Sequence, residues 1–429
     1  MAASIGTAAA GMKLGCIADD FTGATDLANN LVRGGMRVVQ AIGVPGAPIA
    51  DDVDAVVIAL KSRTVAPAEG VGQSLAALRW LREAGARQIY FKYCSTFDST
   101  AEGNIGPVTD ALMDALGCDF TIATPAFPDN KRTVFKGHLF VGDVLLHESG
   151  MQNHPLTPMR DANLVRVLQP QTRRKVGLID YRAVAAGVDA VRERIAALRS
   201  EGVGIAIVDA ISNEDLLRLG PALADLPLVT AGSGVAIGLP ANFGIAPSSA
   251  ASALPRAEGL QAVVSGSCSV ATHGQVLEFI RSGRPALGID PLRIAAGIDV
   301  AGEALAWAKG KLADSPVLVY STADPPTVQQ VQGQLGAAHA GALVEATLAA
   351  IAKGLVGMGV RQLVVAGGET SGACVQALGI TQMRIGAQVD PGVPWCHALV
   401  PGGGGLHIAL KSGNFGTPDF FLKAFKELA

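Results

Sequence analysis

Two adjacent aspartates, Asp19 and Asp20, follow the apolar run 13–18, where a first strand is expected to end. In open α/β sheets, ligands bind beyond the carboxyl ends of the strands. Two neighbouring carboxylates repel each other and lose hydration, so they need a cation, hydroxyl donors or a shared proton to compensate. The turn after this strand is therefore acidic where a dinucleotide-binding domain carries a glycine fingerprint. This pattern favours a polar, hydroxyl-rich ligand.

A helix is expected directly after the aspartate pair. Thr22 is predicted to cap its N-terminus, because a threonine hydroxyl can accept a hydrogen bond from a free backbone N–H of the first turn. Apolar residues recur at helical spacing from Ala24 to Leu31, and the glycine pair 34–35 is expected to end the helix.

Two further loops place polar groups at the ends of predicted strands. Lys and Arg side chains suit a substrate carboxylate, which Arg can bind bidentately, and Asp and Asn suit sugar hydroxyls. The same residue types are common in ordinary turns. Three successive strand ends of this kind nevertheless favour a binding site. The candidate residues of these two loops are Ser62, Arg63, Lys92, Asp98 and Asn104.

The C-terminal half contains glycine-rich turns between a predicted strand and a helix. One turn follows the apolar run 364–366, and a similar turn of small residues follows 261–264. Such turns offer backbone N–H groups and a helix N-terminus to a phosphate. Glycine also ends helices, so one loop is weak evidence, but the loops 401–405 and 411–416 occur in the same half, and together they favour a nucleotide-phosphate site. The residues predicted to line it are Ser265, Ser267, Gly367, Gly368, Glu369, Thr370 and Gly413.

Several familiar catalytic and metal-binding motifs are absent from the sequence. It has no GxxxxGK[ST] phosphate loop and no GxSxG nucleophile elbow, and the loose glycine pattern at 232–238 lacks a clean βαβ unit after it. The histidines and cysteines show no metal-ligand spacing, so no protein-bound transition metal is expected. The cysteines are interpreted as reduced thiols of a cytoplasmic protein.

Charge and hydropathy exclude other classes of protein. A formal net charge of -3 gives no support for nucleic-acid binding. The N-terminal stretch lacks the basic region and the long apolar region of a signal peptide. The uncharged stretch 226–255 is broken by prolines and glycines, which argues against a membrane span. We expect a cytoplasmic protein that binds neither nucleic acid nor membrane.

Predicted strands and helices alternate along nearly the whole chain. This alternation is typical of an α/β fold with mostly parallel sheets covered by helices on both faces. The small, polar, turn-rich residues near 246–255 form the best linker, so we predict a domain at 1–245, a linker at 246–257 and a domain at 258–429. The cleft between two such domains is the expected place of the active site.

Together, these motifs resemble those of the four-carbon acid sugar kinases, two-domain enzymes with an N-terminal sugar-binding domain and a C-terminal nucleotide-binding domain. The resemblance covers nearly the whole chain and is carried by the motifs at 18–24, 61–64, 367–372 and 411–416. It implies that 1–245 binds the sugar acid and that 258–429 binds ATP.

The loop 92–100 resembles that of one particular branch of this family. Its long Cys-Ser-Thr-Phe-Asp-Ser-Thr form, together with the motifs 124–130 and 154–159, is similar to the 3-oxo-tetronate 4-kinase branch. Other relatives carry an arginine in a Lys-x-Asp-Ser-Thr-x-Arg-Gly-Asn type of loop. That arginine is absent here, which leaves recognition of the substrate carboxylate to Arg63, Lys92 or Arg132.

The resemblance implies transfer of the ATP γ-phosphoryl group, with Mg²⁺ accompanying the nucleotide, to the terminal 4-hydroxyl of a four-carbon sugar acid. The implied product from 3-oxo-tetronate is 3-oxo-tetronate 4-phosphate. Asp19 and Asp20 would bind sugar hydroxyls, and one of them or Asp98 would accept the hydroxyl proton. Arg63 and Lys92 would hold the carboxylate. The full predicted substrate-binding set is Asp19, Asp20, Ser62, Arg63, Lys92 and Asn104.

Three alternatives stay open at this point. The protein could be a threonate or erythronate kinase of the same family, or a sugar-acid-binding protein without catalysis. A nicotinamide-dependent dehydrogenase is disfavoured by the acidic first turn. The expected partners are a small sugar acid and ATP, and the sequence leaves homo-oligomer formation open.

Overall fold

The structure is a computed structural model of the chain. It describes residues 11–46, 49, 52–153, 157–323, 330–331, 333–402 and 404–428. Residues 154–156 of the motif at 154–159, and Gly403 of the glycine-rich loop at 401–405, lie outside the described residues. The chain forms two compact units, Met1–Ser252 (unit 1) and Ala253–Ala429 (unit 2). The division between the units falls within the segment 246–257.

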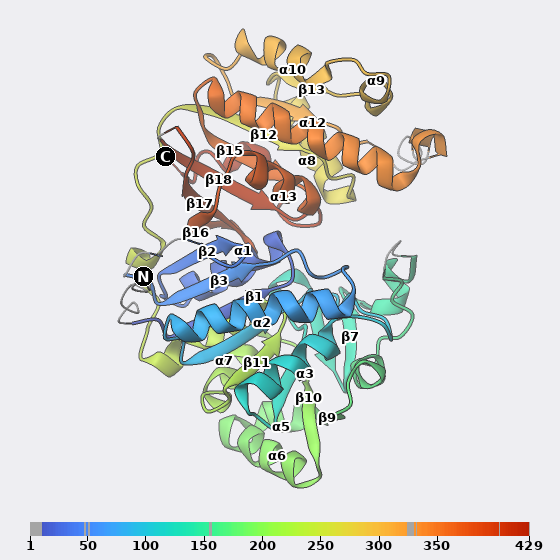
Figure 1. Ribbon diagram of the computed structural model, residues 1–429, viewed down its shortest axis with the longest axis vertical. Coiled ribbons are helices and arrows are strands. Elements are labelled where there is room, and N and C mark those ends of the chain that lie inside the picture. The colour runs from blue at the N-terminus through green and yellow to red at the C-terminus, as the bar shows by residue number, and fades with distance from the viewer. Residues whose placement is uncertain are drawn as a thin grey trace, which may run out of the picture. The chain divides into compact units, whose positions relative to one another are not determined.

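Unit 1 is built on a parallel sheet with the strand order β2-β3-β1-β4-β11-β5-β10-β9 (Figure 1). The strands β1 and β3 are buried along their whole length, as expected for a parallel sheet with helices on both faces. The strands are β1 (Leu14–Ala18), β2 (Val38–Ile42), β3 (Ala55–Ala59), β4 (Gln88–Lys92), β5 (Thr121–Thr124), β9 (Lys175–Ile179), β10 (Val203–Val208) and β11 (Leu228–Ala231).

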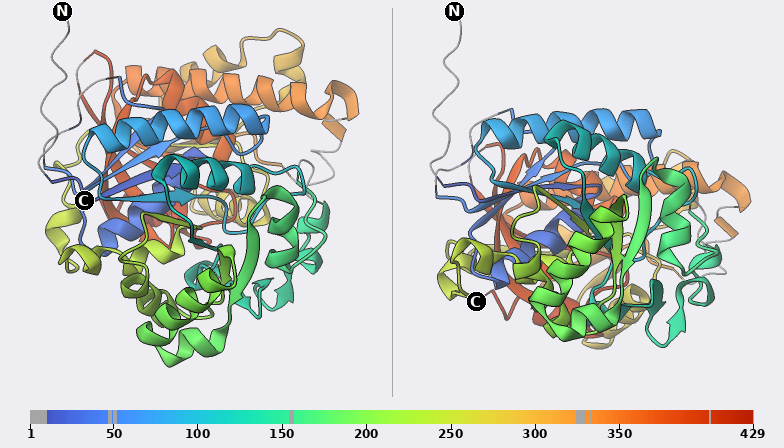
Figure 2. Two further views of the ribbon diagram at one scale, coloured as in Figure 1. Left: turned by 60° about the horizontal axis from the view of Figure 1, so that its bottom comes forward. Right: turned by 90° about the horizontal axis from the view of Figure 1, so that it is seen from below.

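Helices cover both faces of this sheet (Figure 2). α2 and α3 pack against each other on one face, and α1 lies on the other, where it packs against Gly234–Gly238. Right-handed crossovers explain this, because the chain moves along the sheet in one direction through α1 and in the opposite direction through α2 and α3. The helices are α1 (Phe21–Arg33), α2 (Pro67–Glu83), α3 (Ile105–Leu116), α4 (Leu164–Leu168), α5 (Tyr181–Ala186), α6 (Val188–Ser200) and α7 (Asn213–Ala222).

A small antiparallel sheet, β6-β7-β8, is inserted after β5. Its strands are β6 (Arg132–Phe135), β7 (His138–Val141) and β8 (Val144–Leu145). Lys136 and Gly137 connect β6 to β7 with positive φ angles of 50° and 73°, as a tight two-residue hairpin turn requires. Short 3₁₀ turns complete unit 1: η1 (Pro128–Asn130), η2 (Leu146–Glu148), η3 (Met151–Asn153), η4 (Gln169–Gln171), η5 (Gly234–Gly238), η6 (Pro240–Phe243) and η7 (Ser249–Ser252).

Unit 2 has its own sheet, with the order β13-β14-β12-β15-β18-β17-β16. The strands are parallel from β13 to β18, and β17 and β16 are antiparallel to their neighbours. The strands are β12 (Leu260–Ser265), β13 (Ala286–Gly288), β14 (Val317–Tyr320), β15 (Val360–Ala366), β16 (Gln382–Asp390), β17 (Val393–Leu399) and β18 (Gly405–Lys411). The helices are α8 (Val270–Arg281), α9 (Pro291–Ala295), α10 (Val300–Lys309), α12 (Ala337–Gly357), α13 (Gly368–Ala377) and α14 (Phe420–Lys423).

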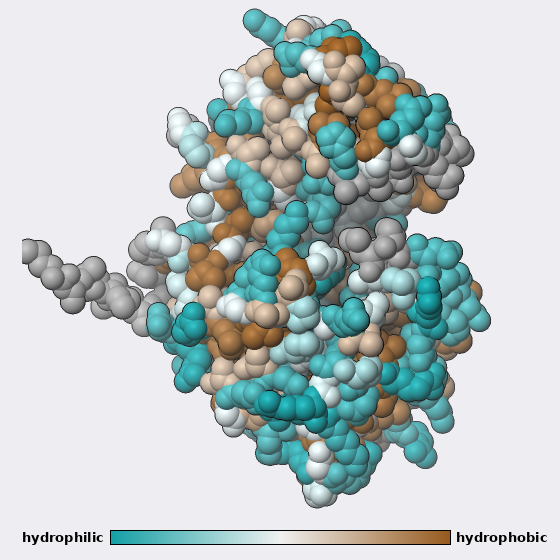
Figure 3. All heavy atoms as spheres, turned by 45° about the vertical axis from the view of Figure 1, so that its right-hand side comes forward, coloured by the Kyte–Doolittle hydropathy of each residue, from teal (hydrophilic) through white to brown (hydrophobic). Residues whose placement is uncertain are grey.

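The core of unit 2 includes an aromatic cluster in which α8 and α14 meet the sheet. Phe279, Trp395 and Phe420 are buried in it. α12 packs against α10 and α13. Its segment His339–Gly357 is long and apolar enough to cross a membrane by length and composition alone, but Leu348, Ile351 and Leu355 of this segment are buried inside the unit. On the face drawn in Figure 3, hydrophilic residues are spread over both units and hydrophobic side chains form smaller patches.

The predicted α/β fold class is confirmed. The apolar patterns of the sequence predict helices at 105–116, 188–200 and 270–281, and α3, α6 and α8 have these bounds. The antiparallel strands β6 to β8, β16 and β17 were not predicted from the sequence.

Candidate active site

The aspartate pair of unit 1 is neutralised by two cations from neighbouring strands. Arg63 binds Asp19 bidentately with one edge of its guanidinium, through Nε–Oδ2 and Nη2–Oδ1 distances of 2.8 Å. Its Nη2 atom also lies 2.6 Å from Asp20 Oδ1, and Lys92 Nζ lies 3.3 Å from the same oxygen. The three strands that end here, β3, β1 and β4, are adjacent in the sheet. Their carboxyl ends therefore bring together four of the predicted site residues.

Asp20 has a structural task as well. It is the N-cap of α1, and its Oδ2 atom accepts hydrogen bonds from the Thr22 hydroxyl and the Gly23 N–H. The prediction that Thr22 caps this helix is therefore wrong. The helix begins at Phe21, one residue before Thr22, and a carboxylate is the stronger acceptor beside the positive end of the helix dipole.

The two carboxyl groups differ in acidity. Burial raises the pKa of Asp19, and the charge and hydrogen bonds of Arg63 oppose this without outweighing it. Burial also acts on Asp20, but there the charges of Arg63 and Lys92 outweigh it and hold the pKa below its ordinary value. Asp20 is thus a fixed anion, and Asp19 is the stronger proton acceptor of the pair.

Gly23 leaves the space that Lys92 occupies. A Cβ atom at this position would lie 1.7 Å from Lys92 Nζ and 2.1 Å from Asp20 Oδ1. The Lys92 side chain is only 4% exposed, so its ammonium has little room to move away. The glycine of the Asp-Asp-Phe-Thr-Gly motif is therefore a packing requirement of the ion-pair cluster.

Asn104 and Ser62 support the loop that carries Arg63. Asn104 Nδ2 donates to the backbone oxygens of Ser62, at 2.8 Å, and of Val65, at 2.9 Å. The N–H of Ser62 in turn donates to Asp19 O. These contacts hold the loop after β3 in place, so Asn104 acts here through the position of Arg63.

Asp98 belongs to a separate group in the loop after β4. Its Oδ1 atom accepts a hydrogen bond of 2.6 Å from the Thr96 hydroxyl, which also lies 2.7 Å from Cys94 Sγ. The intervening Phe97 is buried and has a φ of 52°. No direct contact joins Asp98 to the aspartate pair within the described residues.

Asp26 is a charged residue of this region that the sequence analysis missed. It lies on α1 and is 4% exposed. Its Oδ2 atom accepts a short hydrogen bond from the Ser233 hydroxyl, and its buried Oδ1 atom has no hydrogen-bond partner among the described residues. Burial raises its pKa to about 7, against the opposing charge of Lys92 and the bond from Ser233. The polar residues of α1 that face inward were the available signal: Thr25, Asp26, Asn29 and Asn30 are all buried.

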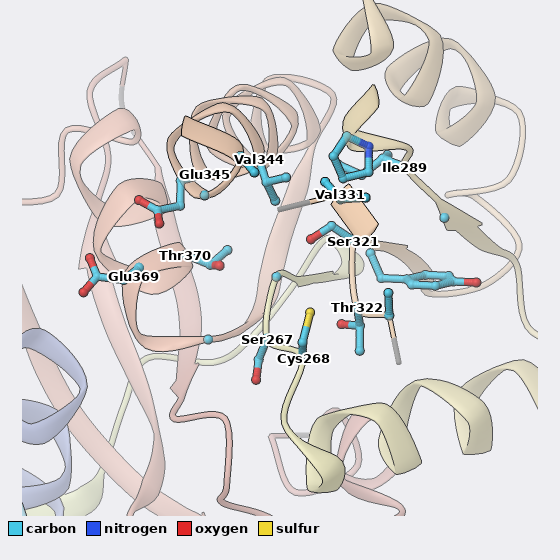
Figure 4. A pocket seen from close by; sticks show the side chains of 18 of the residues that line it. Ser267, Cys268, Ile289, Ser321, Thr322, Val331, Val344, Glu345, Glu369 and Thr370 are labelled. Carbon is cyan, nitrogen blue, oxygen red and sulfur yellow. The ribbon is translucent and has the colours of Figure 1, made fainter. Parts of the chain in front are cut away.

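In unit 2, a cavity of about 700 Å³ opens beside the ends of β12, β14 and β15 (Figure 4). Figure 4 shows Ile289, Val331 and Val344 gathered in one part of it, and Ser267 and Cys268 in another. Such a mixture of apolar walls and a few polar groups is typical of small-molecule sites. The predicted residues that line this cavity are Ser267, Gly367, Gly368, Glu369 and Thr370.

The turn before α13 has the geometry of an anion site. Gly367 has a φ of 120°, which favours glycine, and α13 begins directly after it. The first N–H groups of an α-helix have no partner within the helix and carry the positive end of its dipole. They lie in the wall of the cavity together with Ser267 and Cys268, so this wall suits a phosphate.

Two predicted residues, Ser265 and Gly413, do not line the cavity. The Ser265 hydroxyl is buried and lies 2.8 Å from Thr322 Oγ1. The Gly413 carbonyl accepts hydrogen bonds from Ser269 Oγ at 2.5 Å, Thr272 Oγ1 at 2.8 Å and Lys411 Nζ at 3.1 Å. These two residues therefore contact residues in or next to the cavity wall without lining the cavity themselves.

Lys411 is buried completely, and its ammonium holds the loop after β18. It donates to Thr272 Oγ1 at 2.9 Å and to the backbone oxygens of Ser412, Gly413 and Phe415 at 3.0 to 3.1 Å. Burial lowers its pKa to about 7, and the charge of Asp390 opposes this. The lysine beside the glycine loop thus positions backbone atoms, a role that its place in the sequence did not reveal.

A unit with a compensated carboxylate pair at its strand ends and a second unit with a cavity wall that suits a phosphate fit the class of proteins that bind a polar small molecule and a nucleotide. The family model described as "Sugar-binding N-terminal domain" matches residues 14–239. The model described as "Nucleotide-binding C-terminal domain" matches residues 262–421. The chain belongs to the four-carbon acid sugar kinase family.

Curated relatives support the same assignment. A protein of Pseudomonas savastanoi pv. phaseolicola is 61% identical, over 97% of each chain, and is named 3-oxo-tetronate kinase. A protein of Cupriavidus necator with the same name is 59% identical over 99% of each chain. The predicted family is therefore confirmed.

A solved structure from Salmonella typhimurium LT2 has the same fold. It has a TM-score of 0.87 and 44% identity, and the match covers 97% of this chain and 99% of that one. That protein is described as a putative tRNA synthase. The net charge of -3 gives no support for RNA binding by the present chain.

Proposed function

We propose that this protein is an ATP-dependent kinase that phosphorylates the 4-hydroxyl of 3-oxo-tetronate. The observation that carries the proposal is the set of ion pairs among Asp19, Asp20, Arg63 and Lys92, at three adjacent strand ends of the unit that matches a sugar-binding domain. Full-length relatives at 59 to 61% identity that are named 3-oxo-tetronate kinase support the choice of substrate. In this proposal residues 1–245 bind the sugar acid, 246–257 form the linker, and 258–429 bind ATP.

Within the sugar-acid site, Asp19 and Asp20 would accept hydrogen bonds from substrate hydroxyls. We assign the proton acceptor to Asp19 in preference to Asp20, because a base with a strongly lowered pKa is a weak acceptor. Arg63 and Lys92, which the family resemblance assigns to the substrate carboxylate, also neutralise the aspartate pair. Asp98 is the alternative base, acting from the loop after β4.

In the nucleotide site, the apolar residues of the cavity would hold the base, and the N-terminus of α13 would hold phosphates. The predicted nucleotide-binding residues are Ser265, Ser267, Gly367, Gly368, Glu369, Thr370 and Gly413. No group of three metal-binding side chains occurs in the part of the chain that the structure describes. This suits Mg²⁺, which is commonly held by phosphates and one or two carboxylates.

Glu345 and Glu369 line the cavity and are the carboxylates that would meet Mg²⁺ (Figure 4). When bound with ATP, Mg²⁺ would neutralise phosphate charge during transfer. Cytoplasmic localisation, formation of a homo-oligomer and the absence of nucleic-acid and membrane partners remain predictions.

An ATP-consumption screen tests the proposed function. The purified protein is offered 3-oxo-tetronate, threonate and erythronate with ATP and Mg²⁺, and the products are identified by mass. The expected result is a 4-phosphate formed from 3-oxo-tetronate with the highest kcat/KM. Turnover confined to threonate or erythronate would move the protein to the other branch of the family. ATP binding without turnover of any acid would indicate a binding protein.

The substitution Asp20→Asn tests the role of the carboxylate pair. Asparagine can still cap α1, but it removes the charge that pairs with Arg63 and Lys92. We expect kcat/KM for the acid to fall at least about 100-fold, since hydrogen bonds to charged groups contribute about 1.5–3 kcal/mol each. ATP affinity, measured by calorimetry, should stay unchanged. Asp161→Asn, which removes a half-exposed carboxylate paired with Arg166, is the control. Near-normal turnover by Asp20→Asn would remove Asp20 from the site.

A further inference from the structure

The cations expected to bind the substrate carboxylate are already engaged by aspartates. Arg63 contacts both Asp19 and Asp20, and Lys92 contacts Asp20. Each cation that takes up a second carboxylate would give up part of an existing ion pair. The proposed substrate carries a carboxylate at the end opposite to its reacting hydroxyl, and that group needs a cation of its own. The inference below therefore rests on the proposed function.

Arg132 is a partly buried cation without a carboxylate partner among the described residues. It lies at the start of β6, and its Nη1 atom donates to the backbone oxygen of Asn130. Its Nε atom is buried and has no hydrogen-bond partner in that part of the chain. Burial lowers the pKa of Arg132, although the charges of Cys94, Asp26 and Asp98 oppose this. An arginine in this state has lost water without gaining a carboxylate, so it favours the binding of an anion.

The charged and titratable groups that interact with Arg132 come from two separate elements. Asp26 belongs to α1, and Cys94 and Asp98 belong to the loop after β4, which follows Lys92 directly. The charges of Arg63 and Lys92 also act on Cys94 and lower its pKa, against the larger effect of burial. The loop after β4 therefore lies close enough to interact electrostatically both with Arg132 and with the ion-pair cluster.

The backbone holds Arg132 in a fixed place. Its N–H and C=O both pair with Phe127, at N···O distances of 3.1 and 2.8 Å. The preceding Lys131 has a φ of 58°, and Phe97 in the loop after β4 has a φ of 52°. These are two of the three non-glycine residues with positive φ in the described part of the chain. Such strained conformations are costly and concentrate at functional sites.

We infer that Arg132 binds the carboxylate of the sugar acid through its Nε and Nη atoms. A guanidinium can hold a carboxylate with two parallel hydrogen bonds, and the unpartnered Nε edge offers this geometry. Arg132 would then supply from β6 the positive charge that other relatives supply from the loop after β4, where this sequence has no arginine. The anion site thus sets specificity for an acid over a neutral sugar.

Substrate discrimination gives the sharpest test. Erythrulose differs from 3-oxo-tetronate in having a hydroxymethyl group in place of the carboxylate, so it keeps the reacting end and lacks the anion. We expect Arg132→Met to raise KM for 3-oxo-tetronate about 10- to 100-fold and to leave KM for ATP unchanged. The ratio of kcat/KM for 3-oxo-tetronate to that for erythrulose should fall by a similar factor. Arg132→Lys should recover only part of the loss, because lysine cannot bind bidentately.

Controls separate the inference from a structural effect and from the proposed function. Arg182→Ala removes an arginine of the same unit whose side chain is 89% exposed, and it should keep the wild-type ratio. Equal ratios for wild type and both Arg132 variants would overturn the inference while leaving the kinase function intact. If wild type turns over no acid, the change in melting temperature on addition of threonate tests the anion site instead. If threonate stabilises wild type but neither Arg132→Met nor Arg132→Lys, the anion site is supported and the kinase function is rejected. If threonate stabilises all three proteins equally, or does not stabilise wild type, the anion site is rejected.

Discussion

At the scale of single residues, unit 1 holds buried charges that depend on each other. Asp19 and Lys92 are nearly inaccessible, and each is stable only because an opposite charge lies close by. Removing one partner of a buried pair leaves a charge that neither water nor protein compensates, which is strongly destabilising. The sequence identified these residue types at the strand ends, but not which cation pairs with which carboxylate, because pairing depends on side-chain direction across strands.

Asp26 predicts a specific dependence of stability on pH. Its native pKa of about 7 lies above the ordinary value of about 3.9 expected in the unfolded chain. Below about pH 4 both states hold the proton. Between about pH 4 and 7 only the native state keeps it, so the contribution of Asp26 to stability is lost as the pH rises through this range.

The substitution Asp26→Asn removes this penalty. At pH 8 we expect its free energy of unfolding to exceed that of wild type, by an amount on the order of a few kcal/mol, and the difference should shrink towards pH 4. Denaturant unfolding at several pH values measures it. Parallel pH profiles for the two proteins would contradict the assignment. Asp161→Asn again serves as a control, because this carboxylate is half-exposed and its pKa is lowered by its hydrogen bonds with Arg166.

At the scale of elements, each site is formed by neighbouring strands whose carboxyl ends meet at one edge of a sheet. β3, β1 and β4 do this in unit 1, and β14, β12 and β15 do it in unit 2. The long helices and the buried parallel strands were predictable, because their apolar patterns are strong. β6, β7 and β8 were not, because they have four residues or fewer and their partners lie within one hairpin.

Gly23 allows a test of how α1 and β4 fit together. In Gly23→Ala, the new methyl group would overlap the Lys92 ammonium, so the Lys92–Asp20 pair must separate. We expect kcat/KM for the acid to drop more than about tenfold and the free energy of unfolding to fall by about 1–3 kcal/mol. Gly72→Ala in α2 is the matched control, since a Cβ atom on Gly72 would meet no other atom within 4 Å. That control should gain about 0.5–1 kcal/mol from helix propensity.

Lys411 does not line the cavity, but we expect its buried ammonium to affect nucleotide binding through the loop after β18. In a trans peptide the C=O and N–H bonds point in opposite directions, so three donors that fix the Gly413 carbonyl also fix the direction of the Asn414 N–H. We expect Lys411→Met to weaken ATP binding by about tenfold in calorimetry. Lys353→Met, on an exposed position of α12, should bind ATP like wild type. Unchanged affinity in Lys411→Met would show that this loop does not contribute to the nucleotide site.

At the scale of the whole molecule, the chain forms two compact units, one that matches a sugar-binding domain and one that matches a nucleotide-binding domain. The division between the units falls within the small, turn-rich stretch 246–257 that the sequence predicts as a linker, and the predicted roles of the two domains stay predictions. The sequence also predicted most residues of both candidate sites. The polar residues of α1 were the available signal for Asp26, but the burial of Lys411 could not be predicted, because a polar residue at the end of a strand is recognised as buried only once the packing around it is known.

Because Cys268 is accessible in the cavity of unit 2, its chemical labelling can report whether a ligand occupies that cavity. Cys268 is exposed in the cavity wall, whereas Cys16, Cys374 and Cys396 are buried. Cys94 and Cys118 are partly buried, and burial raises the pKa of Cys94 to about 11 and also raises that of Cys118. A maleimide should therefore modify Cys268 first, because the thiolate is the reactive form and access limits the other thiols. Saturating ATP should protect it, so intact-mass spectrometry after brief labelling would follow nucleotide binding without any measurement of catalysis. Equal labelling with and without ATP would place the nucleotide away from this wall.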